Sequence, residues 1–64
     1  MPITAKDAVK LLKAAGFEET GQKGSHLRLK HPDGRRTVVP MHGGDLKIGT
    51  AKAIAKQTGV KLER

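Results

Sequence analysis

The fold of this 64-residue chain is decided by the stretch SHLRLKHPDGRRTVV, residues 25–39. Its first part predicts a strand over residues 25–31, with Leu27 and Leu29 on one face and basic side chains on the other. A tight turn is predicted at residues 31–34, because proline presets φ, aspartate bonds the local backbone and glycine accepts positive φ. Residues 35–39 then return as the partner strand. Pro40 offers no N–H to a ladder, so it ends that strand or lies on a sheet edge.

An amphipathic helix is predicted N-terminal to this hairpin, over residues 4–15. Thr4 can cap its first turn, and Gly16 suits the left-handed position after its last turn. Apolar residues recur at helical spacing and predict a buried stripe of Ala8, Leu11, Leu12 and Ala15. A short strand over residues 17–22 and a turn near Gly24 then connect this helix to the hairpin.

A second helix is predicted C-terminal to the hairpin, over residues 48–58, after a loop at 41–47. Gly59 ends it, and Val60 and Leu62 can fold back onto the core. Its expected apolar stripe consists of Ile48, Ala51, Ile54 and Ala55.

The fold class that follows is α+β, in the order helix, three strands, helix, with one domain spanning residues 1–64. Two amphipathic helices need one apolar surface, and the face with Leu27 and Leu29 supplies it. We therefore expect a three-stranded antiparallel sheet with both helices packed on one face. The opposite face stays open to a partner.

The charge of the chain is strongly basic, with 13 Lys and Arg against 6 Asp and Glu and a net charge of +7. Such an excess favours nucleic acid as a partner, an acidic protein second and an anionic membrane third.

No apolar run approaches the roughly 20 residues that a membrane span needs, and the N-terminus does not resemble a signal peptide. The absence of cysteine excludes disulfides and thiolate metal sites. We therefore expect a cytoplasmic protein. Phe17 is the only aromatic residue, which argues against reading single strands by stacking bases on aromatic side chains.

The candidate catalytic residue is His26, which follows the small residues Gly24 and Ser25. Arg28 and Lys30 follow at strand spacing and share its face. These cations favour a neutral imidazole, which can take the proton from a ribose 2′-hydroxyl, while the cations stabilise charge on the phosphate. The alternative is an ordinary surface histidine, which a lone histidine in a small domain usually is.

Several other residues form a candidate nucleic-acid surface. The basic side chains that can line it are Lys23, Arg28, Lys30, Arg35, Arg36 and Lys47. Arginines beside a turn are as often merely solvated, and Lys6, Lys10 and Lys13 are expected to form a solvated helix face. His42 lies in a glycine-rich loop; it is a second proton-transfer group, an RNA contact or part of an ordinary connector. No metal site is expected, because His26 and His31 face opposite ways on one strand, and no cofactor is expected.

The order and spacing of five segments resemble the HicA family of bacterial toxins. The segments are Ala15-Gly16-Phe17, Gly24-Ser25-His26, His31-Pro32-Asp33-Gly34-Arg35-Arg36, Val39-Pro40-Met41-His42-Gly43 and Leu46-Lys47-Ile48-Gly49-Thr50. The resemblance covers nearly the whole chain. Two positions depart from the usual pattern, since Leu27 and Leu29 stand where members often carry an aromatic residue, and Ile48 stands where proline is common.

The resemblance implies a fold like that of double-stranded-RNA-binding domains and an mRNA-cleaving ribonuclease that works without metal. His26 matches the catalytic histidine of the family's Gly-Ser-His motif. The implied protein partner is a HicB antitoxin, which binds the toxin and covers its active site.

Three functions remain open on the sequence. The first is an endoribonuclease toxin that uses His26. The second is a nonenzymatic module that binds double-stranded RNA through its shape and backbone. The third is a basic partner of an acidic protein. If RNA is shortened on incubation with the protein, the protein is a ribonuclease and not a nonenzymatic RNA-binding module. A basic partner of an acidic protein is expected to bind RNA only weakly.

Overall fold

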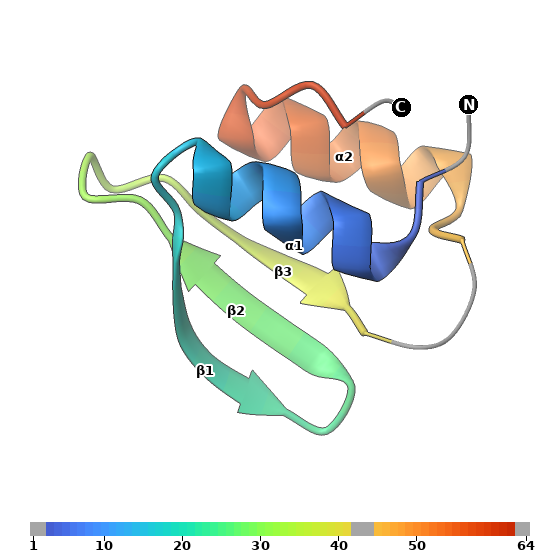
Figure 1. Ribbon diagram of the computed structural model, residues 1–64, viewed down its shortest axis with the longest axis horizontal. Helices are drawn as coiled ribbons and strands as arrows, with labels where there is room; N and C mark the ends of the chain where they lie inside the picture. The colour runs from blue at the N-terminus through green and yellow to red at the C-terminus, as the bar shows by residue number, and fades with distance from the viewer. Residues whose placement is uncertain (1–2, 42–44, 63–64) are drawn as a thin grey trace.

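The structure, a computed structural model, describes residues 3–41 and 45–62. Two helices and three strands follow one another in the expected order (Figure 1), namely α1 (Ala5–Ala14), β1 (Glu18–Lys23), β2 (His26–Lys30), β3 (Arg36–Pro40) and α2 (Ile48–Thr58). The strands form one antiparallel sheet in the order β1-β2-β3. The predicted α+β class and strand arrangement are confirmed.

Helix α1 lies one residue inside the predicted bounds at each end, because Thr4 and Ala15 are its caps. The Thr4 hydroxyl accepts a hydrogen bond from the Asp7 backbone N–H at 3.1 Å, and Gly16 takes a φ of 102° just past the end. Its buried residues are Ala5, Ala8, Val9 and Leu12. The expected burial of Ala15 is wrong, since that residue is the exposed C-cap and lies beyond the last turn that packs on the sheet.

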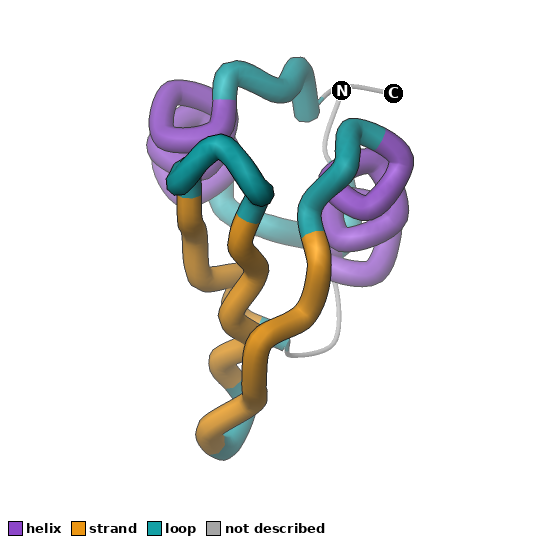
Figure 2. Tube along the Cα trace, turned by 90° about the vertical axis from the view of Figure 1, so that its left-hand side faces the viewer, coloured by secondary structure: helices purple, strands orange, loops and turns teal. Residues whose placement is uncertain are grey.

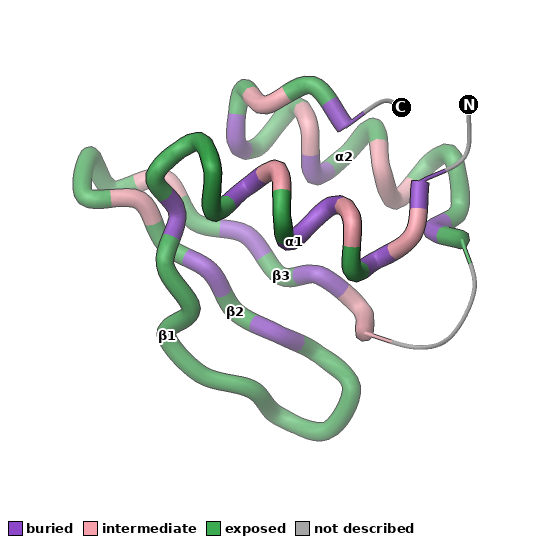
Figure 3. The backbone as a smooth tube through the Cα atoms, viewed as in Figure 1, coloured by how far each residue is buried: buried purple, intermediate pink, exposed green. Residues whose placement is uncertain are grey.

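The sheet is buried on one face only. Exposed and buried residues alternate along β2 and β3, whereas every residue of β1 is exposed (Figure 3). The sequence of β1, EETGQK, has no large apolar side chain to bury, and it contains a bulge between Glu19 and Gly21. Strand β1 therefore extends the sheet without adding to the core.

Helix α2 packs through Ile54 and Thr58, with Ala51 and Ala55 partly buried. The prediction that Ile48 belongs to this stripe is wrong, because its side chain is 69% exposed. Six residues rotate a helix by about 600°, so Ile48 points about 120° away from Ile54. Gly59 ends the helix at a φ of 72°, and Leu62 folds back into the core as expected.

Both helices cover the face that carries Leu27, Leu29 and Val39, which are 4%, 1% and 0% exposed. Figure 2 shows the two helices above the strands, which run downward from them. The buried set also includes Ile3, Phe17 and Leu46. In the part of the chain that is described, neither helix has the length and apolar character that crossing a bilayer requires.

The junction between α1 and β1 provides a test of the fold. Replacing Gly16 by alanine would place a Cβ atom 2.8 Å from Nε2 of His31, at a backbone φ of 102°. The left-handed conformation costs an L-residue about 1–2 kcal/mol, and the contact adds to that cost. We expect Gly16→Ala to lower the free energy of unfolding by at least that amount in urea denaturation.

The matched control is Gly49→Ala, because a Cβ atom at this position in α2 meets nothing within 4 Å. Alanine favours a helix over glycine by up to about 1 kcal/mol, so this variant should be as stable as the parent chain or more stable. Equal stability of the two variants would contradict the proposed strain at Gly16.

Candidate functional site

The open face of the sheet carries the candidate catalytic residue. His26, Arg28 and Lys30 are all exposed and alternate with the two buried leucines of β2. Successive members of this row are separated by about 6.5 Å along the strand. On the neighbouring β3 they pair with Pro40, Val38 and Arg36, respectively. The structure therefore brings the imidazole and the cations onto one accessible face.

His26 begins β2, directly after the turn that contains Gly24 and Ser25. Gly24 has a φ of 58°, and both turn residues are exposed. Lys23 lies opposite His26 on β1 and is the nearest basic residue across the strands. Small neighbours and an exposed position leave the ring accessible to a large substrate.

The turn before His26 is hydrogen-bonded to the segment that follows β3. The Met41 backbone N–H donates a hydrogen bond to the Ser25 carbonyl oxygen. His42 itself lies outside the described residues, so its predicted role stays a prediction.

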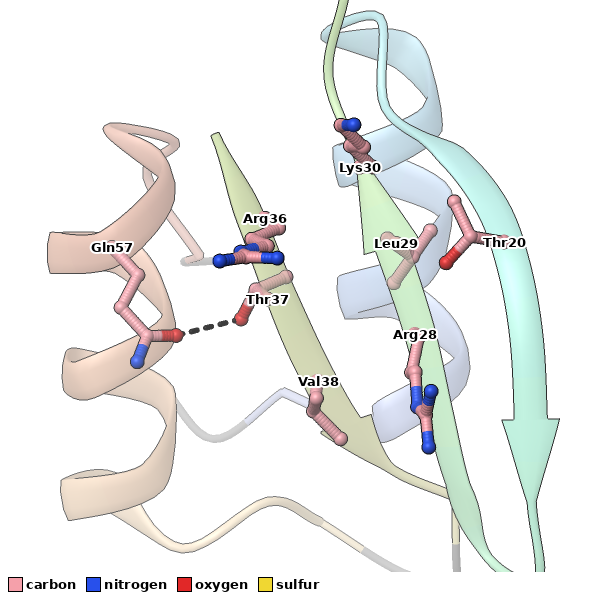
Figure 4. A pocket seen from close by; sticks show the side chains of 8 residues that line it. All are labelled: Thr20, Arg28, Leu29, Lys30, Arg36, Thr37, Val38 and Gln57. Carbon is pink, nitrogen blue, oxygen red and sulfur yellow. Dashed lines mark hydrogen bonds between the residues drawn. The ribbon is translucent and has the colours of Figure 1, made fainter. Parts of the chain in front are cut away.

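A hollow with three cations lies on the same face, further along β2 from His26 (Figure 4). Arg28, Lys30 and Arg36 line it together with Thr20, Val38 and Gln57, and it also touches Leu29 and Thr37, which are buried between the sheet and the helices. We call this hollow the basic hollow. Val38 is 44% exposed there, although it is a large apolar residue. Glu18 pairs with Lys30 across β1 and β2, at the end of the row remote from His26.

Arg35, predicted to bind RNA, is engaged in contacts within the protein. Its Nε donates to Oδ2 of Asp33 at 2.7 Å, and its Nη1 donates to the Thr58 carbonyl oxygen. Its guanidinium also lies 5.3 Å from the centre of the Phe17 ring. The Arg35 backbone N–H, followed by its side chain, lowers the pKa of Asp33 below its usual value. Arg35 therefore joins the hairpin turn to α2.

Lys47, which the sequence predicts to contact RNA, lies away from the row on β2, and so does His31, which the sequence does not assign to the site. Lys47 is the N-cap of α2 and is exposed, but it does not belong to the sheet. His31 is half-buried in the hairpin turn, where its ring packs edge-on against Phe17 at 5.1 Å and its Nδ1 accepts the Asp33 backbone N–H. Within residues 3–41 and 45–62, no three His, Cys, Asp or Glu side chains gather as metal ligands would.

Sequence reasoning missed Val38, Thr20 and Gln57. Val38 could have been found, because strand alternation places it on the same face as Arg36. Gln57 could not, since it reaches the hollow from α2 by accepting a hydrogen bond at 2.8 Å from the Thr37 hydroxyl (Figure 4). Thr20 is the extra residue of the β1 bulge, which the sequence does not locate.

Comparison with known proteins identifies the family. Residues 5–60 match the family described as the HicA toxin of bacterial toxin-antitoxin. This chain belongs to the HicA toxin family. A curated relative, the probable mRNA interferase HicA of Pseudomonas fluorescens (strain Pf0-1), is 43% identical over 51 residues, which cover 78% of this chain and 83% of the relative. The HicA match spans all five helices and strands, including the face that carries His26.

The neighbouring arginines of the turn provide a test of their separate roles. Arg35→Ala removes the Asp33 pair, the bond to the Thr58 carbonyl and the packing on Phe17. Because hydrogen bonds to charged groups contribute about 1.5–3 kcal/mol, we expect a loss of about 1–3 kcal/mol in thermal or urea unfolding.

Arg36→Ala is the matched control, since its exposed side chain lies on the open face. Exposed surface substitutions usually change stability by no more than about 0.5 kcal/mol. An equal loss in both variants would refute the view that Arg35 alone holds the turn to α2.

Proposed function

We propose that this chain is the toxin of a type II toxin-antitoxin pair and cleaves mRNA as an endoribonuclease, with His26 as the general base. The observation that carries the proposal is the exposed imidazole of His26 in line with Arg28 and Lys30 on a face that the helices leave open. Membership of the HicA family and the name of the Pseudomonas relative, an mRNA interferase, support it.

The proposed reaction begins with proton transfer to His26. Imidazole is the side chain whose ordinary titration range reaches neutral pH. Its neutral nitrogen takes the proton of a ribose 2′-hydroxyl, and the oxygen forms a bond to the adjacent phosphorus. The bond from phosphorus to the 5′ oxygen breaks, and that oxygen takes up one proton. The products are a 2′,3′-cyclic phosphate and a 5′-hydroxyl end.

The cations of the open face complement this chemistry. Negative charge grows on the phosphoryl oxygens as the 2′ oxygen attacks, and fixed positive groups stabilise it. Arg28 is the nearest cation along β2 and Lys23 is the nearest across the strands. The attacking group belongs to the RNA and is activated by a side chain, so the scheme uses neither metal nor cofactor.

The proposed protein partner is a HicB-like antitoxin. RNA and an antitoxin would compete for the same basic face if the antitoxin presents acidic groups to it, because both are drawn by the same positive field. An mRNA substrate places the proposed activity in the cytoplasm.

A nonenzymatic module that binds double-stranded RNA is the second candidate. The order of helices and strands and the basic sheet face favour it, since binding through the RNA backbone needs no catalytic group. It predicts salt-sensitive binding without shorter products.

Substitution of the candidate base tests the proposed reaction. His26→Ala should reduce the rate of cleavage of an end-labelled single-stranded RNA by about 10²–10⁴-fold, the usual contribution of general acid–base catalysis. EDTA should leave the wild-type rate unchanged, and the product ends should be cyclic phosphate and 5′-hydroxyl by mass spectrometry.

The control is Lys52→Gln, an exposed residue of α2 outside the proposed site, which should cleave at the wild-type rate. Undiminished cleavage by His26→Ala would remove this residue from the mechanism. Intact RNA with the wild-type chain, combined with salt-dependent binding, would favour the second candidate.

His42→Ala separates the two functional roles proposed for this residue. If His42 protonates the departing 5′ oxygen, the variant should be slow on ordinary RNA and recover on RNA with a 5′-bridging sulfur, which leaves without a proton. A residue that only contacts RNA would instead raise KM on both substrates. Wild-type rates on both would assign His42 to the connecting loop alone.

A further inference from the structure

We propose that the basic hollow is a nucleotide subsite for single-stranded RNA that lies on one side of the cleaved bond. The inference deepens the proposed function and rests on it for the direction of the RNA, but the binding of a nucleotide in the hollow can be tested without cleavage. It predicts that this protein requires nucleotides on only one side of the bond that it cuts.

The charges and their spacing carry the first step. Arg28 and Lys30 follow His26 at intervals of about 6.5 Å, close to the separation of successive phosphates in an extended ribonucleotide strand. Arg36 pairs with Lys30 from β3 and adds a second cation at the same level. A strand with its scissile phosphate at His26 would thus place its next phosphates beside Arg28 and between Lys30 and Arg36.

The two directions away from His26 differ in charge. Toward the hollow lie three exposed cations. In the other direction, the described neighbours Gly24, Ser25 and Met41 are uncharged. Lys23 lies beside His26 across the strands, not beyond it. Phosphate contacts therefore extend from His26 toward Lys30, and Glu18 opposite Lys30 disfavours a phosphate further along.

The hollow also offers contacts to a base. Val38 presents an exposed apolar surface between Arg28, its partner on β2, and Arg36 on its own strand. Guanidinium planes stack on bases, and apolar side chains pack against them. Gly21 pairs with Arg28 from the other side and has no side chain, and a Cβ atom there would meet nothing within 4 Å. The surface around Arg28 therefore has room for a flat ring.

Gln57 supplies a directed polar group at the edge of the hollow. Its Oε1 accepts the Thr37 hydroxyl at 2.8 Å, and this bond orients the side-chain amide. The amide nitrogen is left to donate to an acceptor on a bound base. Recognition of base edges and stacking on bases occur overwhelmingly in unpaired RNA, so the occupant that we propose is a single strand.

Nuclear magnetic resonance titration tests the binding step with the wild-type chain. The probe is a short 2′-O-methyl oligoribonucleotide, which lacks the attacking hydroxyl. We expect amide shifts to centre on Arg28, Val38 and Arg36 and on the Gln57 side-chain amide. Shifts spread evenly over the sheet and both helices, or no binding at all, would overturn the subsite.

Charge-neutral variants test which cations hold the RNA backbone. Arg28→Gln and Arg36→Gln should each weaken binding of the same probe by about tenfold. Each should reduce the slope of log K against log salt by about 0.7, as expected for one phosphate contact on a single strand. Lys52→Gln removes the same charge from the exposed side of α2 and should change neither. Equal effects of all three variants would show only a general charge effect and refute the subsite.

Gln57→Glu tests the base contact with the local structure preserved. A carboxylate still accepts the Thr37 hydroxyl, but it cannot donate to a base and adds a negative charge. We expect weaker binding at an unchanged melting temperature. Unchanged affinity would exclude Gln57 from the subsite.

Chimeric substrates test the direction. Each carries one ribonucleotide in a DNA strand, with zero to six nucleotides on either side. Shortening the flank that occupies the basic hollow to fewer than about two nucleotides should reduce kcat/KM by about tenfold or more. Shortening the opposite flank should have little effect on kcat/KM. Equal dependence on both flanks would refute the one-sided arrangement. A wild-type chain that cleaves none of these substrates would refute the proposed function, while the titration would still decide whether the hollow binds a nucleotide.

Discussion

The register of β2 is the constraint on which the rest of the structure depends. Leu27 and Leu29 point into the core, and the residues between and beside them point to the open face. A slip of one residue would exchange the two faces. It would expose two leucines, at about 1.5–3 kcal/mol each, and would push an imidazole and two cations into an apolar interior at a greater cost. The same alternation that builds the core therefore holds the candidate catalytic row in place.

A cluster of side chains around the hairpin turn joins three segments that are far apart in the sequence. Phe17 comes from the link between α1 and β1, Asp33 and Arg35 from the turn, and Thr58 from the end of α2. Next to it, the bond from Thr37 to Gln57 ties the outer edge of β3 to α2. Both buried threonines thus have hydrogen-bond partners, because Thr58 donates to the Ile54 carbonyl at 2.8 Å. These contacts fix α2 against β3. They thereby hold Gln57 of α2 next to the β3 residues that line the basic hollow.

An open sheet face suits a polymeric substrate. A chain of 64 residues has little interior to spare for an enclosed site, and a long polyanion needs a surface that it can cross. Placing the imidazole on a strand gives it a rigid support, and placing it beside a glycine turn leaves it accessible. Two adjacent arginines have different roles. Arg35 stabilises the turn, whereas Arg36 is exposed to the solvent on the open face.

The sequence by itself determined most of the fold and the centre of the candidate site. Alternation in residues 25–39, the turn at 31–34 and the caps at Thr4 and Gly16 are local signals, and each was sufficient to place its element. The row of His26, Arg28 and Lys30 follows from the same alternation. Only the tertiary structure decided that Arg35 belongs to the turn cluster, that Ile48 is exposed and that Gln57 reaches the basic hollow. The positions of Arg35 and Gln57 depend on contacts between α2 and the hairpin, which are about 20 residues apart in the sequence. The exposure of Ile48 depends on how α2 is rotated about its own axis. Local periodicity carries no information about which distant segment a side chain meets, because packing of the whole core sets that choice.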